Sequence, residues 1–123
     1  MDRKRLLVID DEQDMLDSVA EVLGERFELT LVCDGFDALA VLQQAEFDGV
    51  LLDLKMPGVD GFDVLGYLKA FQPSTRVLIA SGMPSLDRIA ERYGAADWIA
   101  KPYHLVALEE SITRLLGQEP GTL

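Results

Sequence analysis

Five short apolar runs, separated by longer amphipathic stretches, are the feature of this 123-residue chain that most restricts its fold. Four of the runs are almost continuously apolar, which is typical of strands buried on both faces of a sheet. These runs span residues 6–9, 50–52, 77–80 and 98–100. In the fifth run, 27–32, apolar and polar residues alternate, which predicts a half-exposed strand at the edge of the sheet.

The stretches between the runs carry apolar residues at helical spacing. In chain order these positions are Met15, Leu16, Val19, Val22 and Leu23; Phe36, Leu39, Ala40 and Leu42; Val64, Leu65, Leu68 and Phe71; Leu86, Ile89, Ala90 and Tyr93; and Leu105, Leu108, Ile112, Leu115 and Leu116. Asp34 and Asp60 are predicted N-caps, and Gly94 and Gly117 are predicted helix stops. Five strand–helix units in strict alternation indicate an α/β fold: a parallel, doubly wound sheet between two layers of helices.

Length and hydropathy favour one domain without a membrane segment. We expect residues 1–117 to form the domain and 118–123, with Pro120 and Gly121, to form a tail or the start of a linker. No apolar run approaches the ~18 residues that span a bilayer, and run 6–9 is too short for a signal peptide. The sequence therefore predicts a soluble cytoplasmic protein.

Charge and cysteine content exclude several kinds of site. The chain has 22 acidic and 11 basic residues, a net charge of −11, which argues against direct binding of nucleic acid. The single cysteine, Cys33, excludes an internal disulfide and a cysteine-cluster metal site. The single histidine, His104, cannot form a two-histidine zinc site, and we expect it at the entrance of a helix.

Polar side chains follow four of the five runs. Ligands of an open parallel sheet bind beyond the carboxyl ends of its strands. Run 6–9 is followed by Asp10 and Asp11, and the next three buried runs by Asp53, Ser81 and Lys101 respectively. Any one of them alone would be better explained as a helix cap or a loop residue. Four strand ends together predict a common site.

The residue types at this predicted site suit phosphoryl chemistry. Asp10, Asp11 and Asp53 would lie within a few ångströms of one another and repel, and a magnesium ion would relieve that repulsion. A carboxylate held between magnesium and Lys101 can attack phosphorus. The Ser81 hydroxyl and backbone N–H groups would meet the charge of the transferred group.

The motifs around these residues resemble the receiver domains of two-component response regulators, over about residues 5–116. They are Val8-Ile9-Asp10-Asp11-Glu12, Asp53-Leu54-Lys55-Met56-Pro57-Gly58-Val59-Asp60-Gly61, Ser81-Gly82 and Lys101-Pro102-Tyr103. The resemblance implies a flavodoxin-like sheet with strand order 2-1-3-4-5. It also implies a phosphoacceptor signalling domain that catalyses only its own phosphorylation and dephosphorylation and is no enzyme in the usual sense.

The resemblance also implies a role for each residue at the magnesium site. Asp53 resembles the phosphorylated aspartate and would also contact the metal. Asp11 would bind Mg²⁺ directly, and Asp10 would act mostly through metal-bound water. Lys55 would offer the metal its backbone carbonyl.

A second group would contact or sense the phosphoryl group. Lys101 would contact the phosphoryl oxygens, and the Lys101–Pro102 bond would be cis. Ser81 would move to hydrogen-bond the phosphoryl group, and Trp98 stands where the family has its switch aromatic. Since Lys55 and Met83 occupy positions that influence the site in this family, we hypothesise that the Lys55 side chain shields the acyl phosphate from water.

The implied partners are those of the family. A histidine kinase or histidine phosphotransfer protein would donate the phosphoryl group, and an output domain or effector protein would receive the signal. The predicted output surface is the face of the fourth helix, fifth strand and fifth helix, around Tyr93, Asp97, Tyr103 and His104. A homodimer is compatible with the resemblance, although Ala107 and Ser111 stand where charged partners are expected in winged-helix regulators.

Three other functions fit the sequence less well. Phosphatases of the haloacid-dehalogenase type need an acid two residues after the nucleophile, where this chain has Lys55. A pure interaction module would have lost part of the site. A nucleotide-binding protein would carry a glycine-rich phosphate loop after the first strand.

Overall fold

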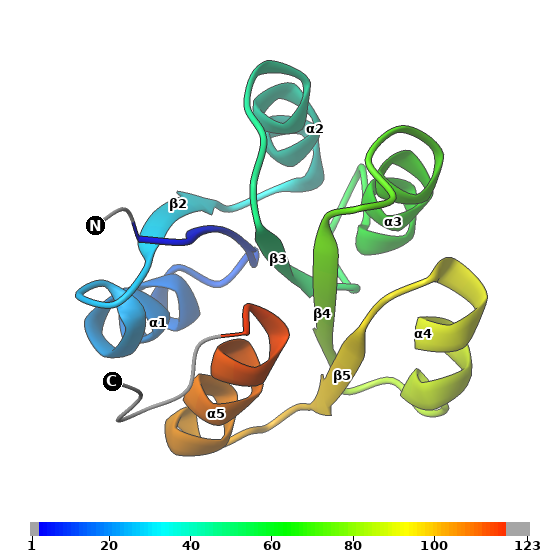
Figure 1. Ribbon diagram of the computed structural model, residues 1–123. Helices are drawn as coiled ribbons and strands as arrows, with labels where there is room; N and C mark the ends of the chain where they lie inside the picture. Colours follow the sequence, from blue (N-terminus) through cyan, green and yellow to red (C-terminus); the bar gives the residue numbers. More distant parts are fainter. Residues whose placement is uncertain (1–2, 118–123) are drawn as a thin grey trace.

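The computed structural model describes residues 3–117, which form five strands and five helices in strict alternation (Figure 1). The strands are β1 (Arg5–Ile9), β2 (Glu28–Val32), β3 (Gly49–Asp53), β4 (Arg76–Ser81) and β5 (Asp97–Ala100). The helices are α1 (Gln13–Leu23), α2 (Gly35–Gln44), α3 (Gly61–Phe71), α4 (Leu86–Tyr93) and α5 (Leu105–Leu115). All neighbouring strands pair in parallel in the order β2-β1-β3-β4-β5, which confirms the predicted fold class.

The predicted tail, 118–123, lies outside the described residues. Within residues 3–117, none of the helices has the length and apolar character that a membrane crossing needs.

Helices cover both faces of the sheet, so the molecule has three layers (Figure 1). Helices α1 and α5 pack on one face, and α2, α3 and α4 pack on the other. Successive residues of β1 enter opposite cores: Leu7 belongs to the cluster under α2 and α3, and Val8 to the cluster under α1 and α5. Because β1, β3 and β4 are buried on both faces, their central positions are continuously apolar, and charged or polar residues occur only at the strand ends.

The two outer strands are only half buried. The edge position predicted for β2 is confirmed. The prediction that 98–100 is buried on both faces is wrong, because β5 is the other edge strand, with Trp98 43% exposed and Ala100 also exposed. A three-residue apolar run does not reveal whether a second strand flanks it.

Three apolar residues predicted to face the core lie at the surface instead. Phe36 is 75% exposed and Ala40 is exposed, while Ala38 and Leu42 form the buried side of α2. The reason is Gly35, where a Cβ atom would lie 2.1 Å from the Val59 carbonyl oxygen. This close approach turns α2 so that its glycine faces the loop after β3.

The third of these residues is Phe71, at the end of α3, which is 71% exposed. Its ring lies 5.0 Å from that of Tyr67, so it covers the side of a neighbouring aromatic rather than filling the core. The other apolar positions predicted for α3, which are Val64, Leu65 and Leu68, are buried.

The start of α3 is fixed against the end of β3. Asp60 forms a capping box: its side chain accepts from the N–H groups of Phe62 and Asp63, and the Asp63 side chain accepts from the Asp60 N–H. Asp34 caps α2 in a similar way, so both predicted N-caps are confirmed. At Gly61 a Cβ atom would lie 2.5 Å from the Asp53 carbonyl oxygen, so only glycine allows this contact.

Arginine side chains bind carbonyl groups at the C-terminal ends of three of the helices. All five helices end near the amino edge of the sheet, where their last carbonyls lack helical partners. Arg3 donates to the Gly24 carbonyl after α1, Arg5 to the Glu46 carbonyl after α2, and Arg76 to the Leu115 carbonyl at the end of α5. Cations at helix C-termini also complement the helix dipole.

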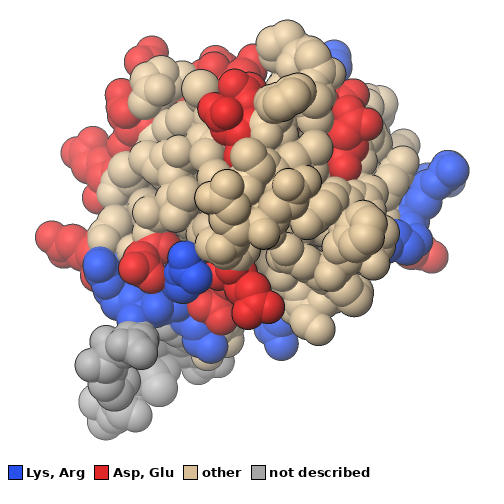
Figure 2. All heavy atoms as spheres, turned by 90° about the horizontal axis from the view of Figure 1, so that it is seen from above, with Lys and Arg blue, Asp and Glu red and all other residues tan. Residues whose placement is uncertain are grey.

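The acidic excess is unevenly spread. Figure 2 views the molecule from the side of α2 and α3 and shows a broad uncharged surface there. The two helices together carry only three charged residues, Asp37, Asp63 and Lys69. The excess of acids therefore lies on other segments, including the carboxyl ends of the strands.

Two glycines of the same helix give a matched test of the Gly61 contact. Gly61→Ala should lower the free energy of unfolding by about 1–3 kcal/mol, because the new methyl group meets the main chain of Asp53 and Leu54. Gly66→Ala should raise it by about 0.5–1 kcal/mol, since nothing lies within 4 Å of its Cβ position. Urea unfolding measures both, and equal effects of the two variants would contradict the close-approach argument.

Candidate functional site

Side chains from three of the four predicted strand ends meet at the carboxyl edge of the sheet, those of β1, β3 and β5. Asp10 directly follows β1, and Asp53 is the last residue of the neighbouring strand β3. The two residues are 4% and 5% exposed. The Lys101 ammonium, from the end of β5, lies 2.9 Å from Asp10 Oδ2 and 3.4 Å from Asp53 Oδ2. One cation thus joins two buried carboxylates that would otherwise repel each other.

The acidic cluster differs from the predicted one. Carboxylate oxygens of Asp10, Asp11 and Glu12 lie within 4.8 Å of one another, whereas Asp53 joins Asp10 through Lys101. Sequence reasoning missed Glu12, whose Oε1 is also 3.9 Å from the Lys101 ammonium. Its position directly after an acidic pair was the available signal.

The donor atoms of this cluster fit a hard divalent cation. Three carboxylates at short range are the ligand type that Mg²⁺ prefers in proteins. Asp10 is held in place on both sides, since its Oδ1 accepts from the Glu12 N–H at 2.9 Å and its Oδ2 from Lys101. Asp11 and Glu12 are exposed and open to an ion from solvent.

The environment of Asp53 disfavours its charged form. Burial, with a contribution from the charge of Asp10, raises the pKa of Asp53 from 3.8 to about 6, although Lys101 and the Lys55 N–H oppose the rise. That N–H donates to Asp53 Oδ1 at 3.2 Å. Burial also opposes the charge of Lys101, yet its hydrogen bond to Asp10 and the charge of Asp53 hold its pKa above the usual value. Asp10 and Asp53 therefore keep Lys101 in its charged form.

The remaining predicted residues lie around this centre. Ser81 is 1% exposed, and its hydroxyl oxygen accepts from the Met83 N–H at 3.1 Å. The side chain of Lys55 is exposed beside Asp53. The Lys101–Pro102 peptide bond is cis, which confirms that prediction. Trp98, on the edge strand β5, is 43% exposed.

Tyr103 is a further neighbour that residue types alone did not assign to the site. It is half-buried, and burial raises its pKa to about 12, helped by the charges of Asp10, Asp53 and Glu12 against that of Lys101. A neutral hydroxyl therefore flanks the ionic centre. His104, next to it, is the N-cap of α5, as predicted.

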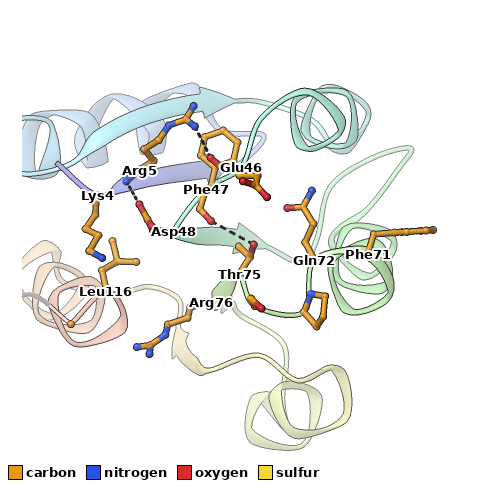
Figure 3. A pocket seen from close by; sticks show the side chains of 13 residues that line it. Lys4, Arg5, Glu46, Phe47, Asp48, Phe71, Gln72, Thr75, Arg76 and Leu116 are labelled. Carbon is orange, nitrogen blue, oxygen red and sulfur yellow. Dashed lines mark hydrogen bonds between the residues drawn. The ribbon is translucent and has the colours of Figure 1, made fainter. Parts of the chain in front are cut away.

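Two hollows differ in what they can do. One of about 450 Å³ lies beside the site, lined by Leu54, Lys55, Met56, Pro57, Asp60, Phe62 and Met83. A larger one of about 740 Å³ lies at the opposite edge, between Lys4, Arg5, Gln72 and Arg76 (Figure 3). Because Arg5 and Arg76 donate to carbonyls near helix ends, they serve the fold rather than a ligand. The ionisable groups that suit chemistry are gathered at the carboxyl edge.

Comparison with known proteins assigns a family. Residues 6–113 match the model of a family described as "Response regulator receiver domain". Response regulator protein FleR of Pseudomonas aeruginosa is 33% identical over 96% of this chain. DNA-binding response regulator MtrA of Mycolicibacterium paratuberculosis is 33% identical over 98% of it. The chain covers 26% of the length of FleR and 56% of that of MtrA, so these relatives are much longer than the segment they share with it.

A solved structure agrees. A response regulator receiver domain protein (CheY-like) from Methanospirillum hungatei superposes with a TM-score of 0.87 and 28% identity, covering 94% of each chain. That match extends over nearly all of the structure described above.

The raised pKa of Asp53 makes stability depend on pH. Because the folded state holds the Asp53 proton more tightly than the unfolded chain does, this carboxyl stabilises the fold below about pH 4, and the contribution is lost as pH rises through about 6. Without divalent cations, Asp53→Asn should therefore be more stable than the original protein by about 2–3 kcal/mol near pH 7.5 and equally stable near pH 4.

Urea unfolding at both pH values measures the difference. Asp17→Asn, which changes an exposed aspartate of α1, serves as the control and should give a small and similar effect at both. A difference for Asp53→Asn that does not vary with pH would contradict the assignment.

Proposed function

Because the chain belongs to the family of response regulator receiver domains, we propose that it accepts a phosphoryl group on Asp53 and signals through the resulting change of conformation. The observation that supports this most is the partly buried Lys101 ammonium between Asp10 and Asp53. In this arrangement the Asp53 carboxylate is poorly solvated, held in place and close to a positive charge.

The reaction is an in-line transfer between two anionic partners. An oxygen of Asp53 forms a bond to phosphorus while the bond from phosphorus to the donor nitrogen or oxygen breaks, and the leaving atom keeps the electron pair. Lys101 lies close enough to Asp53 to contact the negatively charged oxygens of the phosphoryl group as it is transferred to that residue. The Lys55 N–H donates to Asp53 Oδ1, and the Ser81 hydroxyl, which now accepts from the Met83 N–H, would donate to the phosphoryl group after turning toward it.

Mg²⁺ is the proposed cofactor. Receiver domains bind this ion at an acidic pocket, and Asp10, Asp11, Asp53 and the Lys55 carbonyl would hold it here. The ion would supply positive charge to the phosphoryl oxygens. Glu12, close to both the cluster and Lys101, would balance the charge on its exposed side.

The proposed partners follow from the family. A histidine kinase or histidine phosphotransfer protein is the phosphodonor, and the domain turns over no external substrate. Residues 1–117 act as the receiver, and 118–123 as a tail or linker. The signal passes to an output domain or an effector protein in the cytoplasm. MtrA is described as a DNA-binding regulator, but this chain covers only about half of that protein.

The proposed output surface is formed by α4, β5 and α5. Ser81 and Trp98 are its proposed switch residues, and an exposed Trp98 at an edge strand has room to change its surroundings. A homodimer through this face would not use Ser111, which is buried in α5.

A small phosphodonor tests the proposal. Incubated with acetyl phosphate and Mg²⁺, the protein should gain the mass of a single phosphoryl group. Asp53→Ala should gain none, because the accepting oxygen is gone. Removal of Mg²⁺ with a chelator should abolish the adduct, and Trp98 fluorescence should change only when the adduct forms. Intact-mass spectrometry and fluorescence on the same samples give both readouts.

The matched control is Glu21→Ala, which removes an exposed acid of α1 far along the helix from the site. It should be phosphorylated like the original protein. If no adduct forms under any condition, the domain works by binding alone. An adduct that persists in Asp53→Ala would place the phosphoryl group elsewhere.

Lys55 is proposed to protect the acyl phosphate. Its exposed side chain stands beside Asp53, so Lys55→Ala should admit water and raise the rate constant of dephosphorylation several-fold. Loss of phosphorylated mass after the phosphodonor is removed measures this rate. Lys4→Ala, which removes an exposed lysine at the opposite edge, should leave it unchanged. Equal rates for Lys55→Ala and the original protein would exclude shielding.

A further inference from the structure

Ser85, at the head of α4, has an unfavourable backbone conformation. Its φ and ψ are 61° and 37°, in the left-handed region, and it is the only residue other than glycine with positive φ within 3–117. The three glycines with positive φ have no Cβ atom to clash there, but serine has one. The loop after β4 therefore ends in a strained residue.

The same conformation deprives α4 of a cap. Serine is among the best N-cap residues, yet the Ser85 hydroxyl makes no capping hydrogen bond. Asp34 and Asp60, which do cap their helices, have extended backbones with φ of −154° and −95°. A left-handed N-cap residue cannot direct its side chain at the first turn in that way. Strain and a missing cap thus coincide at Ser85.

The loop that contains this strain is tied to the proposed site. The Ser81 hydroxyl accepts from the Met83 N–H at 3.1 Å, so the first half of the loop is bound to a side chain that would be drawn toward a phosphoryl group on Asp53. Loss of that hydrogen bond would release residues 82–84, which precede Ser85.

The other end of α4 is anchored to α3. Lys69 Nζ donates to the Arg92 carbonyl at 2.9 Å, and the rings of Phe62 and Tyr93 lie 5.7 Å apart. Gly94, with φ of 73°, closes the helix. Strain at the N-terminal end and these contacts at the C-terminal end favour a tilt of α4 about its C-terminal end.

We propose that Ser85 is a strained hinge that sets the balance between the resting and the phosphorylated conformation. This rests on the proposed function. When Ser81 turns to the phosphoryl group, the loop is released and Ser85 moves to an extended backbone. Its hydroxyl then caps the first turn of α4, and the helix tilts about its anchor at Tyr93. Because the strain raises the free energy of the resting conformation, less free energy is needed to reach the switched one.

Two substitutions at this exposed position should act in opposite directions. Ser85→Gly removes the strain of the resting state, so the switched state should become about five- to thirtyfold rarer. Ser85→Thr should favour the switched state, because a β-branched residue tolerates positive φ even less and threonine can still cap.

The measurement is a titration with beryllofluoride, an analogue of the phosphoryl group, in the presence of Mg²⁺. Bound ligand is followed by its ¹⁹F NMR resonance, and urea unfolding of the ligand-free variants is recorded alongside. Ser85→Gly should need about five- to thirtyfold more beryllofluoride for half-saturation, since apparent affinity falls with the fraction of competent protein. Ser85→Thr should need less. Without ligand, Ser85→Gly should be the more stable variant.

The possible outcomes distinguish failure of the hinge from failure of the proposed function. Shifts of the two variants in the same direction, or no shift in either, would overturn the hinge and leave the proposed function intact. Failure of the original protein to bind beryllofluoride at all would overturn the proposed function, and the hinge with it. Asp53→Asn should abolish binding in every background, which shows that the titration reports on the site.

Discussion

The contact between Lys101 and the carboxylates of Asp10 and Asp53 is the interaction on which the rest of the structure depends. All three groups are largely removed from water, where an unpaired charge would cost several kilocalories per mole. They come from the ends of β1, β3 and β5, so the contact exists only when the strands of the sheet are in their observed order and register. The fold therefore creates the site, although the burial of Asp53 costs stability once this carboxyl is ionised.

The apolar packing beneath this centre gives it its chemical character. Leu52 and Ile79 are fully buried below the site, and Gly61 lets α3 approach the backbone of Asp53 closely. A carboxylate in such surroundings is a better nucleophile than one in water, because less solvation has to be given up as its charge is transferred. Residues that never contact a ligand thus determine the reactivity of the one that does.

The sequence predicted the sheet, its helices and the residues at the strand ends, because a buried parallel strand needs a continuous apolar run and its polar successor has to lie at the rim. The sequence could not predict which apolar residues remain exposed at the surface rather than buried in the core. Phe36 and Trp98 are exposed because of how a helix is rotated and where a strand lies in the sheet, and both depend on distant segments. Nor did it reveal Ser85, since serine is not a residue type that signals positive φ. Glu12 was overlooked because its role depends on the reach of a lysine 89 positions away.

The two edge strands affect how copies of the domain can associate. The free edge of a sheet offers main-chain hydrogen bonds to any other chain and invites aggregation. Here β5 has only four residues and is followed closely by Pro102, which has no N–H to donate, while β2 begins with the exposed Glu28. Neither edge in the described part of the chain presents a long, flat, apolar template. Copies of the domain that associate would therefore do so through side chains, so that charge and shape, rather than main-chain strand pairing, select the partner.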